Sequence, residues 1–147
     1  MSLEAEIEVV FAQSVRPDDE ELFEIDSEGA LEMLRGRSWR EVNAADADYH
    51  SFALVAFSPR GFAYFLPAFM LAALRQESLG VSDRVIDSLS PPKGNAARPS
   101  FARRWQCLTQ KQKAVAVQFL RHFQKRNPLA IGAAIAALER ETKGTTP

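Results

Sequence analysis

Apolar side chains recur along most of this chain with the spacing of amphipathic helices, and no segment shows the regular alternation typical of strands. Near the start, Leu3, Ile7 and Phe11 would lie on one helical face. We predict a first helix that ends near Arg16, because Pro17 disfavours helical geometry in the residue before it. The β-branched residues of this segment leave a strand open as an alternative.

Two further helices are predicted before residue 58. Ser27 can cap a short helix, and Gly36 is a plausible stop for it. A longer helix is expected over about residues 44–57, where Tyr49 and Phe52 belong to a set of apolar side chains at helical spacing.

The most apolar segment of the chain is Phe62–Leu74. It follows Ser58-Pro59, a cap and then a proline at the first helical position, where the missing amide hydrogen costs nothing. We predict a helix over residues 61–74 with a kink or a fresh start at Pro67, since proline removes a hydrogen bond inside a helix. Because the segment is apolar on almost every side, it should form the centre of the fold.

Two signals follow this central segment. Ser82 is a candidate cap for a short helix that contains Val85 and Leu89. Residues 90–100 are rich in Pro, Gly, Ser and Asn and lack large apolar groups up to Ser100, so we predict an exposed loop there.

The last third of the chain carries two predicted helices. Thr109 and Gln112 have the spacing of a capping box, which predicts a helix over about residues 110–125. Asn127-Pro128 gives a second cap followed by proline, and this helix should run to about Glu141.

These elements predict an all-α fold, a compact orthogonal bundle of five to seven helices around a central apolar helix. The chain of 147 residues is close to the common size of one domain and can bury a substantial core without disulfides or metals. We therefore expect a single helical domain over residues 1–142 and a disordered tail over residues 143–147.

Charge is segregated along the chain although it nearly cancels overall. Residues 1–48 hold fourteen acidic and four basic side chains, the rest holds five acidic and fourteen basic ones, and the formal net charge is −1. All nine charged side chains between Ser88 and Leu138 are basic. Two interpretations stay open: the two portions screen each other within the domain, or the basic region meets an acidic partner or nucleic acid.

The composition of the chain indicates the cellular compartment in which the protein is expected. The single cysteine, Cys107, cannot form an intramolecular disulfide, and the start of the chain lacks the pattern of a secretory signal. The longest apolar region, thirteen residues, is shorter than the roughly 18 that a membrane span needs. We expect a cytoplasmic protein without a membrane segment.

Few residues that could bind a metal or act in catalysis lie close together in the sequence. His50, His122 and Cys107 are the only histidine and cysteine residues, and no two are paired locally, so we predict no metal site. Cys107 could act as a nucleophile only if the fold brought His122 onto it, and a small buried cysteine is the simpler interpretation. No glycine-rich or Walker-type phosphate motif occurs, and we expect no cofactor.

Candidate contact residues come from the basic region. Arginines lie on both sides of Trp39 and directly before Trp105, a grouping that can hold a phosphate beside a stacked base, although buried tryptophans with a cation at the ring are commoner. The 110–125 helix also has a basic side opposite its apolar stripe, which either is simply solvated or binds an anionic partner. The candidate contacts for an acidic protein or nucleic acid are Arg98, Arg103, Arg104, Lys111, Arg121 and Lys125.

The centre of the chain carries a family resemblance. The segment Phe57–Met70 reads Phe-Ser-Pro-Arg-Gly-Phe-Ala-Tyr-Phe-Leu-Pro-Ala-Phe-Met. It resembles a family of small bacterial proteins, a domain of unknown function, with the motif Tyr, Tyr or Phe, Leu, Pro, Ala, aromatic after a Ser-Pro turn. A tryptophan near Trp39 and a Leu-Thr-x-x-Gln helix start near Leu108 are similar too. The resemblance implies an α-helical bacterial cytoplasmic protein and brings no catalytic residue. Its structural motif falls here on Tyr64, Leu66, Pro67 and Phe69.

Three functions follow from these observations, in order of preference. The first is a non-catalytic protein-interaction module with segregated acidic and basic surfaces and an unknown protein partner. The alternative is weak, sequence-independent nucleic-acid binding through the same basic side chains. An enzyme whose site is assembled from distant residues is the second alternative. The oligomeric state is not indicated by the sequence.

Overall fold

The computed structural model describes residues 1–25, 27–76, 80–93 and 98–144. Over these ranges the chain forms nine α-helices and three short 3₁₀ helices, and strand pairing is limited to one isolated bridge between Phe23 and Phe57. The predicted all-α class is confirmed. The chain is divided more finely than the five to seven helices predicted, because one expected helix is split and another begins inside an expected loop.

The α-helices are α1 (Leu3–Val10), α2 (Glu28–Leu34), α3 (Ala44–Tyr49), α4 (Ala53–Ala56), α5 (Pro59–Arg75), α6 (Val81–Leu89), α7 (Arg98–Gln106), α8 (Gln110–Phe123) and α9 (Pro128–Gly144). The 3₁₀ helices are η1 (Asp19–Glu21), η2 (Trp39–Glu41) and η3 (Gln124–Arg126).

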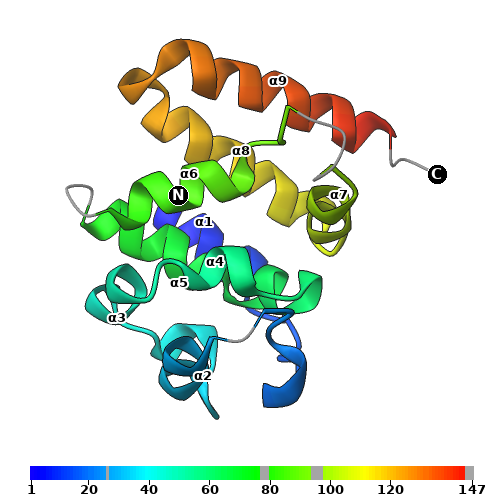
Figure 1. Ribbon diagram of the computed structural model, residues 1–147. Coiled ribbons are helices and arrows are strands. Elements are labelled where there is room, and N and C mark those ends of the chain that lie inside the picture. The colour runs from blue at the N-terminus through cyan, green and yellow to red at the C-terminus, as the bar shows by residue number, and fades with distance from the viewer. Residues whose placement is uncertain (26, 77–79, 94–97, 145–147) are drawn as a thin grey trace.

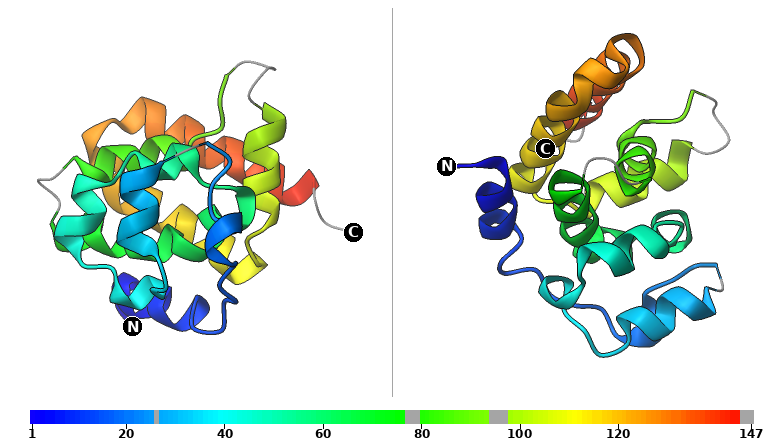
Figure 2. Two further views of the ribbon diagram at one scale, coloured as in Figure 1. Left: turned by 60° about the horizontal axis from the view of Figure 1, so that its bottom comes forward. Right: turned by 90° about the vertical axis from the view of Figure 1, so that its left-hand side faces the viewer.

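The helices are stacked in three tiers (Figure 1). Helices α8 and α9 lie at one end, α2 and α3 lie at the opposite end, and α1, α4, α5 and α6 lie between them (Figures 1 and 2). Helix α5 packs against α1, α3, α6 and α7 and so forms the centre. The chain therefore begins and ends in different tiers of one packed body.

Helix α5 confirms the predicted central element. The Ser58 hydroxyl accepts the Gly61 N–H at 3.0 Å, and Pro59 occupies the first helical position. The motif residues Tyr64, Leu66, Pro67 and Phe69 are all buried. The helix continues through Pro67, so the fresh start predicted as one of two outcomes does not occur. Packing on all sides offsets the hydrogen bond that the proline removes.

The helices of the first half are shorter than predicted. Helix α1 ends at Val10, six residues before the expected stop. The helix expected over residues 44–57 is broken at residues 50–52 into α3 and α4. The break changes the helical phase, so Tyr49 is 79% exposed and Phe52 is 40% exposed instead of joining the apolar face. The spacing of apolar residues in the sequence does not reveal that a helix is interrupted in this way.

Of the other predicted caps and loops, one is confirmed in position only and two are corrected. Ser27 occupies the N-cap of α2, as predicted, but its side chain makes no capping hydrogen bond. Helix α6 begins after Gly80, and Ser82 is instead buried with its hydroxyl accepting from Arg126 Nη1 at 2.6 Å. The expected loop 90–100 lies partly outside the described residues, and its last three residues are already helical in α7.

The helices of the last third follow their predicted starts. Thr109 and Gln112 form the predicted capping box, with Oγ1 of Thr109 accepting from the Gln112 N–H at 3.1 Å. Helix α9 continues to Gly144, and the rest of the expected tail lies outside the described residues. None of the helices in the described ranges combines the length and apolarity that crossing a membrane would require.

Candidate interaction surface

Helix α8 carries a basic stripe on its solvent side. Its opposite side is buried and includes Val115, Phe119 and Phe123, which fixes the orientation of the helix. The outward positions recur at three- and four-residue spacing and span about 21 Å at 1.5 Å per residue. This α8 stripe consists of Lys111, Ala114, Gln118, Arg121 and His122 of α8 and continues to Lys125 of η3, all exposed.

Two lysines of the stripe are in a position to pair with an anionic partner. Within the described part of the chain, Lys111 and Lys125 have no ion pair. Arg121 contacts Glu139 of α9 at 3.4 Å, and both side chains are about half exposed, so the pair is weak. Lys113 is turned inward with Nζ 5.9 Å from the ring centre of Trp105. The stripe therefore keeps a net positive charge.

The two neighbouring arginines of α7 point in opposite directions. Arg103 is exposed and has no ion pair among the described residues. Arg104 turns inward and donates to the carbonyl oxygens of Leu54, Val55 and Phe57 at 2.8, 3.0 and 2.8 Å. Burial lowers the pKa of this guanidinium from its usual value.

Arg104 has a structural role in these contacts. It satisfies carbonyl groups at the end of α4, which have no partner inside that short helix. We therefore leave Arg104 out of the contact surface that the sequence predicted. Arg98 begins α7, but its side chain lies outside the described part of the structure.

Both tryptophans are core residues, as favoured from the sequence. The indole N–H of Trp39 donates to the carbonyl of Phe11 at 3.3 Å, and the guanidinium of Arg40 lies 4.5 Å from its ring centre. Trp105 is buried and stacks on Phe101. Neither ring is exposed as a platform for a nucleic-acid base.

The acidic counterpart of this surface lies at the other end of the molecule. We call residues 18–24, which run through η1, the acidic end. Ser58 holds this segment against the start of α5, donating its N–H to the carbonyl of Leu22 at 2.8 Å and its hydroxyl to that of Glu21 at 2.7 Å. The close approach requires Gly61, because a Cβ there would collide with the Leu22 carbonyl.

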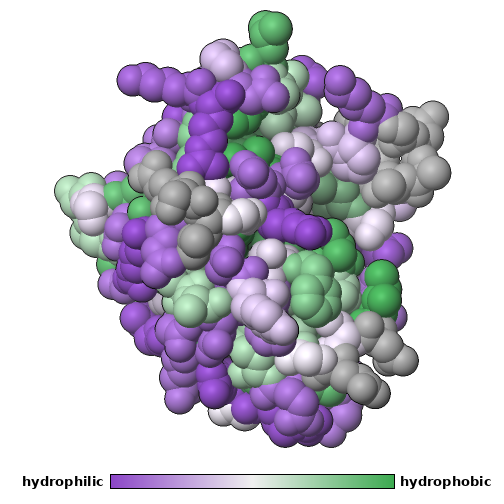
Figure 3. Space-filling view, turned by 60° about the vertical axis from the view of Figure 1, so that its left-hand side comes forward, coloured by the Kyte–Doolittle hydropathy of each residue, from purple (hydrophilic) through white to green (hydrophobic). Residues whose placement is uncertain are grey.

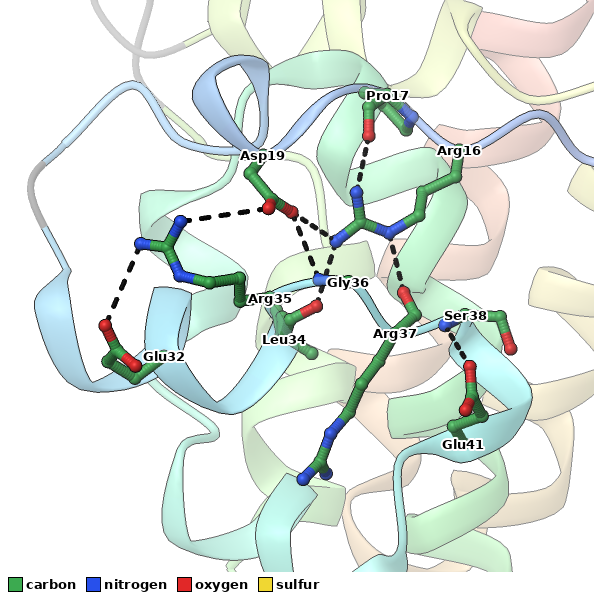
Figure 4. Close-up of polar contacts among 10 residues, drawn as sticks. All are labelled: Arg16, Pro17, Asp19, Glu32, Leu34, Arg35, Gly36, Arg37, Ser38 and Glu41. Atoms are coloured by element: carbon green, nitrogen blue, oxygen red, sulfur yellow. Dashed lines mark hydrogen bonds and ion pairs between the residues drawn. The ribbon is translucent and has the colours of Figure 1, made fainter.

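Arg16 fixes the acidic end against the end of α2 (Figure 4). Its Nε donates to the carbonyl of Arg37 at 2.6 Å, and its two terminal nitrogens donate to those of Pro17 and Leu34 at 2.8 and 2.9 Å. The same group bonds the carboxylate of Asp19 at 2.7 Å. This hydrogen bond from Arg16 lowers the pKa of Asp19, and burial opposes it only in part.

Other acidic side chains near Arg16 form ion pairs or hydrogen bonds at the exposed surface. Arg35 lies 3.9 Å from Asp19 and 3.8 Å from Glu32 (Figure 4). The Ser38 N–H donates to Glu41 at 2.8 Å, and this hydrogen bond is the main cause of the lowered pKa of Glu41. Many of the acids counted in the sequence thus already have partners.

Some acids remain available. Asp18 and Glu20 are exposed and, within the described residues, have no ion pair. The acidic end lies in the tier of α2, whereas the second half of α8 and all of α9 lie in the opposite tier (Figure 2). The acidic end therefore stands apart from the second half of the stripe, and acids and bases of the two halves of the chain screen each other where they meet, as between Arg60 and Glu21 at 3.6 Å and between Arg75 of α5 and Glu4 or Glu8 of α1 at 3.3 and 3.5 Å.

Cys107 is exposed at a hollow, so the prediction of a small buried cysteine is wrong, and the structure brings no histidine to it. The hollow has a volume of about 340 Å³, and its walls include Ser14, Arg60, Tyr64 and Thr109. Burial raises the pKa of the Cys107 thiol, which disfavours the reactive thiolate, while Arg60 opposes the shift more weakly. No histidine or carboxylate is among the described wall residues, so a base for this thiol is not in place.

The two histidines lie elsewhere. His122 is exposed on the α8 stripe, and His50 follows α3 beside Gly29. Among the described residues, no group of three or more His, Cys, Asp or Glu side chains could hold a metal ion.

Exposed apolar side chains at both ends were missed from the sequence. Near the acidic end, Ile25 and Val55 are 62% and 59% exposed, and the Ile25 N–H donates to the carbonyl of Ala56, beside Val55. At the start of α9, Leu129 is 89% exposed. On the face drawn in Figure 3, hydrophobic surface occurs as separate areas among hydrophilic side chains. The only sequence signal for Leu129 is its place directly after Asn127-Pro128, before the small residues of α9.

Comparison with known proteins gives one match. A family described only as a family of unknown function, DUF6714, matches residues 5–140. No curated protein and no solved structure matches the chain.

Proposed function

This chain belongs to the family of unknown function DUF6714, and from that premise we propose a non-catalytic protein-interaction module. Its contact surface is the α8 stripe together with Arg103, and its partner is an acidic protein surface. The family resemblance of the central motif also leads us to propose a bacterial, cytoplasmic protein.

One observation carries the proposal. Lys111 and Lys125 of the α8 stripe, and Arg103 of α7, are exposed and have no ion pair within the described residues. Exposed cations raise the rate of association with anionic surfaces and select against cationic ones. Arg121 adds a further charge to the stripe, because its exposed contact with Glu139 is weak enough to be exchanged for a better one.

The non-catalytic part of the proposal is supported by the state of Cys107. A thiol whose pKa is raised is mostly protonated near neutral pH, and the protonated form is a poor nucleophile. The wall residues described around it supply neither a base nor a group that orients one. Enzymatic activity remains the third candidate, and it would have to use a different constellation.

Nucleic-acid binding through the same side chains is the second candidate. It is favoured by the 21 Å span, at about 1.5 Å per residue, over which the stripe presents its cations. It is disfavoured by the burial of Trp39 and Trp105, which removes the stacking that single-strand binders use. Contact with duplex phosphates would give an affinity that falls with salt by a log–log slope of about 0.9 per phosphate.

The test compares two polyanions in one binding assay. A fluorescent polyglutamate peptide and a fluorescent DNA duplex are titrated with the protein at low salt and followed by anisotropy. We expect saturable binding of polyglutamate and weaker binding of the duplex. The variant Arg103→Glu with Lys111→Glu should lose about tenfold or more in polyglutamate affinity, because two attractions become repulsions.

The matched control reverses two exposed arginines away from the stripe, Arg35→Glu with Arg84→Glu. It has the same net charge as the stripe variant, so a loss confined to the stripe variant assigns the binding to that surface. Equal losses in both variants would mean that only net charge matters and would contradict the proposal. Tighter binding of the duplex would support the nucleic-acid alternative instead.

A further inference from the structure

The two charged ends of the molecule point to the identity of the acidic partner. We propose that the α8 stripe of one molecule binds the acidic end of a second copy of this chain. The inference rests on the proposed function and names its partner. It follows from three features of the described residues: complementary unpaired charges, a rigid acidic end, and exposed apolar side chains beside both charged surfaces.

The charges left without ion pairs are complementary. The acidic end offers Asp18 and Glu20, and the stripe offers Lys111 and Lys125. Because the acidic end and the second half of the stripe lie in opposite tiers, one molecule cannot bring that half of its stripe onto its own acidic end (Figures 1 and 2). Two molecules can, and their formal net charge of −1 each opposes the approach only slightly.

The acidic end is rigid before it binds. Four acceptors on Pro17, Asp19, Leu34 and Arg37 hold the Arg16 guanidinium, and the Ser58 bonds hold Glu21 and Leu22 to α5. A surface that is already ordered loses less conformational entropy when it docks. The carboxylates of Asp18 and Glu20 are therefore presented on a fixed frame.

Apolar side chains accompany both charged surfaces. Ile25 follows the acidic end directly, and its N–H donates to the carbonyl of Ala56, the residue after Val55, while Leu129 follows η3, which contains Lys125. Interfaces commonly have an apolar centre and a charged rim, and the apolar centre supplies most of the affinity. If Leu129 contacts Ile25 and Val55 of the next copy, these side chains would form the apolar centre of the interface, and the ion pairs would form the rim around it.

The proposed contact joins different surfaces on the two copies. The pair would then retain one free acidic end on one copy and one free stripe on the other, so association continues beyond the dimer. The average mass should rise steadily with concentration. A symmetric dimer would instead reach a plateau at twice the mass of the monomer.

Sedimentation velocity of the full chain tests this association. The measurement is made from about 10 mM salt, where the Debye length is about 30 Å, to about 150 mM, where it is about 8 Å. We expect the weight-average mass to rise with concentration at low salt and to fall toward the monomer at high salt. A monomer at all concentrations in low salt, or a plateau at the dimer, would overturn the inference.

Two charge-reversed variants assign the surfaces. Asp18→Lys with Glu20→Lys reverses the acidic end, and Lys111→Glu with Lys125→Glu reverses the stripe. Each variant alone should associate about tenfold more weakly or worse, since two attractive pairs become repulsive. An equimolar mixture should associate again, because the reversed surface of each variant complements a surface of the other. Loss without recovery in the mixture would overturn the inference.

A control variant with the same net charge tests whether the effect of the acidic-end variant comes from net charge alone. Glu6→Lys with Asp87→Lys has the same net charge as the acidic-end variant and leaves residues 18–24 intact. It should self-associate like the wild type. If it is weakened as much as the acidic-end variant, net charge alone governs association and the inference falls.

The polyglutamate assay separates this inference from the proposed function. A wild-type protein that stays monomeric but binds polyglutamate through the stripe would remove the self-association and leave the proposed function standing. A protein that does neither would remove both. Leu129→Asn adds an independent measurement, because it removes the apolar contact without adding charge and so should weaken self-association while leaving polyglutamate affinity within about twofold.

Discussion

The acidic end and the α8 stripe use charged side chains in opposite ways. At the acidic end, Arg16 donates to three carbonyls and a carboxylate, and Asp19 accepts from both Arg16 and Gly36. Along the stripe, Lys111 and Lys125 have no such partners within the described residues. The first set of charges holds the fold together, and the second is free for recognition. Counting charges along the sequence does not separate these two roles.

Arg104 shows that the two roles can alternate between adjacent residues. It belongs to the basic region by sequence, yet it contacts three carbonyls and lies 5.2 Å from the ring centre of Phe62. Its neighbour Arg103 is exposed. Structural arginines should therefore affect stability when replaced, and exposed basic residues should affect only binding.

The largest expected effect is on the attachment of the acidic end. Gly61→Ala places a methyl group against the backbone carbonyl of Leu22, which cannot move without displacing the segment bonded to Ser58. We expect a loss of about 3 kcal/mol or more in the free energy of unfolding, measured by urea denaturation. Gly80→Ala is the control, because nothing lies within 4 Å of its Cβ and it should be nearly neutral. Equal effects of the two changes would contradict the close approach at Gly61.

The next largest effect is expected within the basic region, where replacing Arg104 should cost much more stability than replacing its neighbour Arg103. Arg104→Met leaves the carbonyls at the end of α4 without donors, and we expect a loss of about 2–3 kcal/mol in unfolding free energy. Arg103→Met should change stability by no more than about 0.5 kcal/mol. Thermal and urea unfolding of the two variants measure the difference. If Arg103→Met is as damaging, the assignment of roles to this pair is wrong.

Arg16 is expected to give a smaller loss because its side chain is partly exposed. Arg16→Met removes its hydrogen bonds at the acidic end, and we expect about 1–2 kcal/mol in unfolding free energy. Arg35→Met, which removes only long contacts at an exposed surface, should cost less than about 0.5 kcal/mol. Hydrogen exchange should also show faster opening of residues 18–24 in the Arg16 variant alone. Unchanged exchange there would show that Arg16 does not order the acidic end.

The pH dependence of stability provides a finer test. Because Arg16 keeps the pKa of Asp19 below its unfolded value, the Asp19 carboxylate stabilises the fold above that unfolded value. This contribution is lost as the pH falls through the folded pKa. Asp19→Asn should thus lower the melting temperature near pH 7, and the difference from the wild type should shrink as the pH falls through the folded pKa of Asp19. Asp18→Asn is the control, and a constant difference at every pH would contradict the mechanism.

The smallest expected effect on stability is at the stripe. Lys111→Ala with Lys125→Ala removes charges that make no ion pair in the described chain, so unfolding free energy should change by no more than about 0.5 kcal/mol. Binding of polyglutamate should nevertheless weaken severalfold. A marked loss of stability would show that these lysines are structural, which would erase the contrast with the acidic end.

The sequence alone determined the features that depend on neighbours within a few residues. The capping box of Thr109 and Gln112 and the buried stripe of α8 are each encoded by residues three or four apart, and the apolar run Phe62–Leu74 encodes the centre of α5. The burial of Trp39 and Trp105 also follows from the general cost of exposing large apolar rings. Such local signals give the all-α class and the central helix.

Only the tertiary structure decided which charges are available. Arg103 and Arg104 have the same sequence context, and their roles differ because the end of α4 brings unpaired carbonyls to one of them. Ser82 accepts from Arg126, which is 44 residues away, instead of capping its own helix. The break at residues 50–52 likewise exposes Tyr49 through a change of phase. A buried polar group takes the partner that the fold brings to it, and no spacing along the chain specifies that partner.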